Sequence, residues 1–115
     1  MRFKFWKSKL DRILDAIRET ANDLVQKYDF VTSVQVVCSK RNNLYVINSY
    51  YQIAPLSKVL EVFMVLDKDS IKENILTPRK ASSVYKDLAD KVLHDLQEEL
   101  SRYQKIINRR PVGLV

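Results

Sequence analysis

The sequence predicts an α+β fold of two layers, a sandwich in which two helices cover one face of a mainly antiparallel sheet of three or four strands. Residues 10–28 and 81–107 repeat apolar side chains at the three- and four-residue steps of a helix, and the block between them is rich in β-branched residues. With 115 residues, of which 46% are hydrophobic, the chain suits one domain. We expect a single domain over residues 1–115, with the element order (β)αβββα and a flexible tail at residues 108–115.

The first helix is expected to begin near residue 9. Ser8 stands three residues before Asp11, which is the spacing of a capping box with Asp in place of the usual Glu or Gln. The apolar face of this helix consists of Leu10, Ile13, Leu14, Ile17, Ala21, Leu24, Val25 and Tyr28. Residues 1–7 fit both a short edge strand, because Phe3 and Phe5 alternate with other residues, and an extension of the helix. Both interpretations stay open.

The central block predicts three strands with short connections. Residues 30–38 are rich in β-branched side chains, and the sequence Lys-Arg-Asn-Asn at 40–43 supplies turn residues before a return strand at 44–53. Pro55 ends that strand, and residues 59–66 form the third, so the short connections favour an antiparallel meander. Both faces of the third strand are apolar: Leu60, Val62, Met64 and Leu66 share one, and Val59, Glu61, Phe63 and Val65 share the other.

The second long helix is expected to begin at Pro78, with Thr77 as its N-cap, after a segment at 67–79 that has no clean periodicity. Its apolar stripe consists of Ala81, Tyr85, Leu88, Val92, Leu96, Leu100, Tyr103 and Ile107. The helix residues that we expect to be buried against the sheet are Ile13, Ile17, Leu24, Leu88, Val92 and Leu96.

Composition excludes several classes of site. Gly113 is the only glycine, so no glycine-rich loop can cradle a phosphate and no GXXG loop can clamp RNA. The single cysteine, Cys38, and the single histidine, His94, stand in different segments, which excludes a Cys/His zinc site and a disulfide framework. No apolar run approaches the roughly 18 to 20 residues of a membrane span. We therefore expect a cytoplasmic protein without a metal or another cofactor.

Neither His94 nor Cys38 is expected to be catalytic. His94 lies among charged residues of a helix without a matched nucleophile, which favours a solvated histidine. Cys38 stands near Lys40 and Arg41, whose charges favour a thiolate if the sulfur is exposed, but free cysteines usually pack as small apolar residues. We therefore expect that the protein is not an enzyme.

The charge of the chain suits an acidic partner. Lys and Arg outnumber Asp and Glu by 20 to 14, which gives a formal charge of +6, and clustered cations neutralise phosphates by releasing counterions. The clusters stand near the start of the chain, at the hairpin tip and at both ends of the second long helix. The candidate RNA-binding residues are Lys7, Lys9, Arg12, Lys40, Arg41, Arg79, Lys80, Lys86, Lys91, Arg102, Lys105, Arg109 and Arg110.

The element order and two stretches of sequence resemble the ribosome hibernation promoting factor family, which includes the ribosome-associated inhibitor of the small subunit. The stretches are Tyr28-Asp-Phe-Val-Thr-Ser-Val-Gln-Val-Val37, and Asp87-Leu-Ala-Asp-Lys91 through Leu96, Leu100, Arg102, Tyr103 and Lys105, together about half of the chain. The resemblance implies a β-α-β-β-β-α domain with two parallel helices on one face of a four-stranded sheet. It also implies that basic residues of the helices contact small-subunit ribosomal RNA near the decoding centre and silence translation.

The positions to which that role carries over are Lys80, Lys86, Lys91, Arg102, Lys105 and Arg109. The order αβββα is also similar to double-stranded RNA-binding domains, whose lysine-rich entry to the last helix is echoed by Thr77-Pro-Arg-Lys-Ala81. We therefore expect a non-catalytic factor that binds RNA or the ribosome, with a translation-silencing role implied by the resemblance.

The alternative is a protein-interaction module, either a homodimer or an adaptor, that uses the apolar outer face of the sheet. The residues of that interface would be Tyr50, Val59, Phe63 and Val65.

Overall fold

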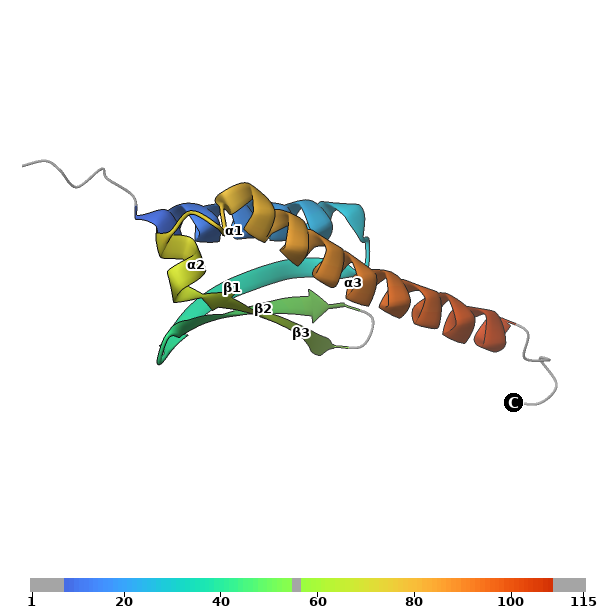
Figure 1. Cartoon of the computed structure of the whole chain (residues 1–115). Helices are drawn as coiled ribbons and strands as arrows, with labels where there is room; N and C mark the ends of the chain where they lie inside the picture. The colour runs from blue at the N-terminus through green and yellow to red at the C-terminus, as the bar shows by residue number, and fades with distance from the viewer. Residues whose placement is uncertain (1–7, 55–56, 109–115) are drawn as a thin grey trace, which may run out of the picture.

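The computed structural model describes residues 8–54 and 57–108, and it has the α+β architecture that the sequence predicts (Figure 1). Its elements are α1 (Lys9–Lys27), β1 (Val31–Arg41), β2 (Leu44–Ile53), β3 (Lys58–Asp67), α2 (Lys68–Lys72) and α3 (Pro78–Asn108). The strands form one antiparallel sheet in the order β1-β2-β3, and α1 and α3 lie on one face of it (Figure 1). The two interpretations of residues 1–7 lie outside the described residues, as do residues 109–115 of the expected tail. Asn108, which we expected to begin that tail, is instead the last residue of α3.

Both long helices begin where the sequence predicts. Ser8 Oγ accepts a hydrogen bond from the backbone N–H of Asp11 at 3.1 Å, and Asp11 Oδ2 accepts one from the N–H of Ser8 at 3.4 Å, which completes the capping box. At the start of α3, Thr77 Oγ1 accepts from the N–H of Lys80 at 3.2 Å, and Pro78 is the first helical residue. Local side-chain chemistry therefore sets both helix starts.

The strands follow the predicted meander. Arg41 pairs with Leu44, so the β1–β2 hairpin has a two-residue loop, and its first residue, Asn42, has a φ of 53° in the left-handed region that asparagine tolerates. Strand β1 is longer than predicted and continues to Arg41. The alternation predicted for β3 is confirmed, because Val62, Met64 and Leu66 are buried and Val59, Phe63 and Val65 are exposed.

The buried face of α3 differs from the prediction. Leu88 is 38% exposed, and Val92 and Leu96 are only half-buried. The fully buried residues of α3 stand four residues apart: Ala81, Tyr85, Ala89 and Leu93. The small side chains of the two alanines allow α3 to approach its neighbours closely, so the contact line follows the alanine ridge and not the bulkiest residues. The prediction for α1 is confirmed, since Ile13, Ile17 and Leu24 are buried.

The segment after β3 forms a short helix, α2, which the sequence did not predict. Its one buried residue is Ile71, and a single apolar side chain gives no periodicity to detect. The backbone N–H of Lys68 donates to the carbonyl oxygen of Asn43 at 3.0 Å, and Asn43 Nδ2 donates to Asp69 Oδ2 at 3.2 Å. Helix α2 is therefore held against the tip of the β1–β2 hairpin.

Three polar side chains meet inside the otherwise apolar core. Ser49 and Tyr51 of β2 and Tyr85 of α3 are fully buried. Ser49 Oγ donates to the carbonyl oxygen of Val62 at 2.9 Å, Tyr85 Oη donates to Ser49 Oγ at 2.8 Å, and the hydroxyls of Tyr51 and Tyr85 are hydrogen-bonded. Because the proton of Tyr85 is given to Ser49, Tyr51 must donate to Tyr85. Burial raises the pKa of both phenols, so the hydroxyls of Tyr51 and Tyr85 stay protonated at neutral pH.

Replacing Tyr85 with phenylalanine should destabilise the fold, because the Tyr51 hydroxyl then lacks its acceptor inside the core. We expect Tyr85→Phe to lower the free energy of unfolding by about 1 to 3 kcal/mol, the cost of an unsatisfied buried polar group. Urea denaturation measures this difference, and we expect the slope of the free energy of unfolding against urea concentration to be unchanged.

The matched control is Tyr103→Phe, whose side chain is 58% exposed and which should change the free energy of unfolding by less than about 0.5 kcal/mol. The double variant Tyr51→Phe, Tyr85→Phe also removes the unsatisfied donor, so we expect it to be no less stable than Tyr85→Phe alone. Equal stabilities of Tyr85→Phe and the parent protein would contradict this account.

Candidate functional site

Helices α1 and α3 run parallel, which brings their N-terminal ends to the same end of the molecule. Lys9 and Arg12 of α1 line a hollow together with Thr77 and Pro78 at the start of α3. At the other end of α1, Lys27 is ion-paired with Asp90 of α3. The unsatisfied N–H groups of a helix start carry a partial positive charge, so both helices add positive potential to one end of the protein.

Basic side chains from separate segments surround these helix starts. Lys9 Nζ donates to the carbonyl oxygen of Lys72 at 2.8 Å, and Lys9, Lys68 and Lys72 line one hollow together with Tyr45. Lys40 is paired with Tyr45 in the register of β1 and β2, and paired residues share a face of a sheet. Arg79 and Lys80 lie in the first turn of α3. We call this set the basic pole, and its residues are Lys9, Arg12, Lys40, Lys68, Lys72, Arg79 and Lys80.

Cations outnumber carboxylates at the basic pole. The ion pairs between Lys27 and Asp90 and between Lys91 and Asp95 lie away from it. The acidic residues within two sequence positions of its cations are Asp11, Asp67, Asp69 and Glu73. Seven cations against these four carboxylates leave the basic pole with an excess of positive charge.

The structure brings only part of the predicted RNA-binding set together. The members that lie at the basic pole are Lys9, Arg12, Lys40, Arg79 and Lys80, and Arg41 lies next to it on the outer face of the hairpin. The predicted residues further along α3 are Lys86, Lys91, Arg102 and Lys105. Lys7, Arg109 and Arg110 lie outside the described residues.

Lys68 and Lys72 belong to the basic pole although the sequence analysis did not single them out. They stand in the segment without periodicity, where no element could be assigned. Their spacing in the sequence could have indicated this position. Lys68 and Lys72 are four residues apart, which places both on one side of a helical turn, and the apolar Ile71 lies between them in the sequence.

The outer face of the sheet is apolar and exposed. The large apolar side chains that it exposes are Val37, Leu44, Val59, Phe63 and Val65, and Phe63 is the most exposed at 60%. Of the predicted interface residues, Val59, Phe63 and Val65 are in this set, and Tyr50 lies on the same face but is half-buried. The charged residues on this face are Arg41, Glu61 and Asp67, so it has no excess of positive charge.

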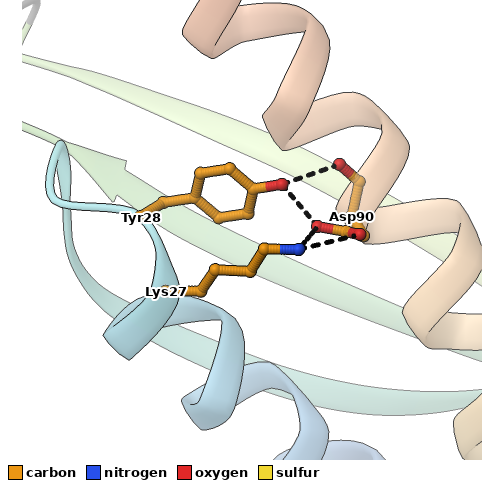
Figure 2. A network of polar contacts seen from close by, with 3 residues as sticks. All are labelled: Lys27, Tyr28 and Asp90. Carbon is orange, nitrogen blue, oxygen red and sulfur yellow. Dashed lines mark hydrogen bonds and ion pairs between the residues drawn. The ribbon is translucent and has the colours of Figure 1, made fainter.

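A polar cluster joins the end of α1 to the middle of α3 (Figure 2). Tyr28 Oη donates to Asp90 Oδ1, and Lys27 Nζ lies 3.0 Å from Asp90 Oδ1 and 3.2 Å from Oδ2. The hydrogen bond from Tyr28 and the charge of Lys27 lower the pKa of Asp90, while burial and the bond to Asp90 raise the pKa of Tyr28 to about 12. At neutral pH the carboxylate stays ionised and the phenol protonated, so the cluster is a fixed link between the helices.

The other candidate residues lie apart from these sites. His94 is exposed on α3, where it lies beside Glu98 and Arg102. Cys38 is half-buried, and burial raises the pKa of its thiol, which fits a packing role. In the part of the chain that the structure describes, no cluster of three or more His, Cys, Asp or Glu side chains could hold a metal ion. No helix in that part is both long and apolar enough to cross a membrane.

Comparisons with protein-family models, with curated proteins and with solved structures found no match for this chain. The described residues contain three strands, where the hibernation promoting factor family has four. The resemblance to that family stays a prediction. The basic pole and the outer sheet face are therefore the two surfaces from which a function can be inferred.

Replacing Asp90 with asparagine should remove a pH-dependent contribution to stability. The pKa of Asp90 lies below its ordinary value of 3.8, so its carboxylate stabilises the fold above that value, and this contribution is lost as the pH falls through the lowered pKa. We expect Asp90→Asn to lower the free energy of unfolding at neutral pH by about 1.5 kcal/mol, the lower end for a hydrogen bond to a charged group. The difference from the parent protein should shrink in strong acid.

Asp95→Asn is the matched control for that measurement. Asp95 is ion-paired with Lys91 on the same helix, but its side chain is 62% exposed against 31% for Asp90. We expect a change below about 0.5 kcal/mol for this exposed pair. Equal effects of the two variants in urea denaturation across the pH range would show that the link in Figure 2 contributes nothing beyond a surface charge.

Proposed function

We propose that this protein is a non-catalytic RNA-binding protein that holds phosphate groups at its basic pole. The observation that carries the proposal is the convergence of cations from α1, β1, α2 and α3 around two helix starts. These cations come from four separate segments of the sequence, and they outnumber the neighbouring carboxylates by seven to four. Such a surface attracts a polyanion through counterion release and through the positive ends of the helices.

The shape of the basic pole favours a nucleic acid over a small anion. Four of its cations, Lys9, Arg12, Lys68 and Lys72, line two adjoining hollows that share Lys9 and Ile71, so these cations extend along the surface and do not converge on one point. Tyr45 lines one of these hollows and is half-buried, which leaves part of a ring available for base stacking. The resemblance to the hibernation promoting factor family makes the small ribosomal subunit the first partner to test.

Neutralising the basic pole should weaken binding to RNA and flatten its dependence on salt. The variant is Lys9→Gln, Lys68→Gln, Lys72→Gln, and the measurement is the affinity for a fluorescent RNA hairpin across a salt series. Each lost phosphate contact lowers the slope of log K against log salt by about 0.7 to 0.9, so we expect the slope to fall by about 2 to 3. Co-sedimentation with small ribosomal subunits provides the second readout.

The matched control carries the same number of neutralised cations along α3: Lys86→Gln, Lys91→Gln, Arg102→Gln. We expect this control to change the slope of log K against log salt by less than the contribution of one phosphate contact, about 0.7 to 0.9. An equal loss in both variants would show a general effect of charge and contradict a site at the basic pole, and a loss confined to the control would assign the RNA to the face of α3 that the family resemblance implies. Absence of binding by the parent protein at low salt would exclude RNA as the partner.

A second candidate function is docking of a protein partner on the outer sheet face. The observation that favours it is the group of exposed apolar side chains on one face, of which Phe63 is the most exposed. Exposed apolar patches of this kind mark interaction surfaces, and aromatic residues are enriched at their centres. The absence of excess positive charge on this face separates it from the proposed RNA site.

Photo-crosslinking tests the outer face directly. A photoreactive phenylalanine analogue at position 63 should give a discrete protein adduct in cells, because Phe63 is the most exposed apolar residue of the patch. The control is the same analogue at Val84, which is 54% exposed on α3 and lies off the sheet. Identical adducts at both positions, or adducts to RNA alone at position 63, would contradict a protein-docking role for this face.

A further inference from the structure

The outer face of the sheet has room for a second copy of this chain. Helices α1 and α3 lie on the opposite face, so within the described residues no helix covers the outer face (Figure 1). The strands have 10 or 11 residues each, which makes the face about 34 Å long and about 14 Å wide. Two such faces in contact would bury about 1,000 Å² in total, which is the area that a specific interface needs.

Cross-strand pairing arranges the outer side chains in five rows. Each row contains one residue of β1, one of β2 and one of β3, because β2 pairs with both neighbours. From one end of the sheet to the other, the rows are Ser33-Gln52-Val59, Gln35-Tyr50-Glu61, Val37-Asn48-Phe63, Ser39-Val46-Val65 and Arg41-Leu44-Asp67. The charged residues Arg41 and Asp67 therefore lie at opposite edges of the last row.

Two aligned sheets can be related by a two-fold axis along the strands or across them. Aligned sheets keep their strands within about 30° of each other, and a two-fold interface uses the same patch on both copies. An axis along β2 places β1 over β3 of the second copy, and each row then faces the same row. An axis across the strands places each strand over its own copy and reverses the order of the rows.

The axis along β2 pairs the charged and polar side chains. Arg41 lies opposite Asp67 of the second copy. Asp67 Oδ2 accepts a hydrogen bond from Ser70 Oγ at 3.0 Å, and because this donor is neutral, the carboxylate keeps the charge that attracts Arg41. Gln35 lies opposite Glu61, and its amide is a donor for that carboxylate. Each contact occurs twice in the dimer because of the two-fold symmetry.

The same axis brings apolar side chains together. Val37 lies opposite Phe63 of the second copy, and both side chains are exposed in the single chain. Leu44 and Val46 lie on the axis, so each faces its own copy. Apolar contacts with polar contacts beside them are the arrangement of a specific interface.

The axis across the strands places both carboxylates against valines. Glu61 would lie opposite Val65 of the second copy, and Asp67 would lie opposite Val59. A carboxylate buried against apolar side chains costs free energy, because it loses water without gaining a donor from the second copy. The charges of the outer face therefore favour the axis along β2.

We propose that the protein forms a homodimer in which two outer sheet faces pack around a two-fold axis along β2. The dimer rests on the second candidate function, docking of a protein on this face, and the docked protein is a second copy of this chain. A nucleic acid is a poor occupant, because Glu61 and Asp67 outnumber Arg41 on this face. The axis also places both basic poles at one end of the dimer, since the row beside the β1–β2 hairpin faces itself.

Sedimentation equilibrium of the purified whole protein tests the dimer. We expect a concentration-dependent dimer, and an association at least about tenfold weaker for Phe63→Gln, because this side chain is the most exposed apolar residue of the face. The matched control is Val84→Gln, which replaces a 54% exposed residue of α3 away from the sheet and should leave association unchanged. A parent protein that stays monomeric at hundreds of micromolar, or a Phe63→Gln variant that associates as tightly as the parent, would overturn the proposal.

Spin labels distinguish the two axes. In a Cys38→Ser background, a label on Ala54→Cys lies at an exposed position beyond the end of β2, outside the five rows. With the axis along β2, the two labels lie less than about 20 Å apart, because packed sheets are about 10 Å apart. With the axis across the strands, the labels lie about 40 Å apart, from a rise of about 3.4 Å per residue on either side of the centre. The short distance supports the proposal, and the long one overturns it.

The photoreactive analogue at position 63 separates this dimer from docking of a different protein. In the purified protein it should give an adduct with twice the 13.5 kDa mass of one chain. If this adduct is absent and the analogue captures a different protein in cells, the homodimer is overturned and the second candidate function stands. If neither adduct forms, both are overturned.

Discussion

The buried hydrogen-bond chain of Tyr51, Tyr85 and Ser49 determines where α3 lies on the sheet. Tyr85 Oη lies 2.8 Å from Ser49 Oγ, and a rotation or an axial shift of the helix would break this short contact. A shift of α3 would leave polar groups unsatisfied in the core, where each costs about 1 to 3 kcal/mol. In the described part of the chain no buried side-chain polar atom lacks a partner. The position of α3 that satisfies this hydrogen-bond chain also brings Asp90, five residues after Tyr85, to Lys27 at the end of α1.

That placement separates two surfaces of different chemistry. The start of α3 lies beside the start of α1 at the basic pole, whereas its second half extends past the sheet (Figure 1). The helices cover one face of the sheet and leave the opposite face with Phe63 exposed. Helix α3 therefore takes part in the basic pole and leaves the outer sheet face open.

The features that short-range chemistry determines could be predicted from the sequence. The caps at Ser8 and Thr77 depend on residues within one turn, and the alternation in β3 depends on neighbouring positions. The exposure of Leu88 could not be predicted, because the contact line on α3 follows its alanines and depends on the neighbours of the helix. The basic pole was missed in part for a similar reason: Lys68 and Lys72 acquire their role only when α2 packs beside Lys9.

The acidic segment of α3 limits how far an RNA bound at the basic pole can extend. Asp95, Glu98 and Glu99 would repel a phosphate backbone, so such an RNA gains little from following α3 past the sheet. The contact at Arg102 that the family resemblance implies lies beyond these carboxylates. An RNA that reached Arg102 as well as the basic pole would therefore need two separate segments, one for each end of the helix.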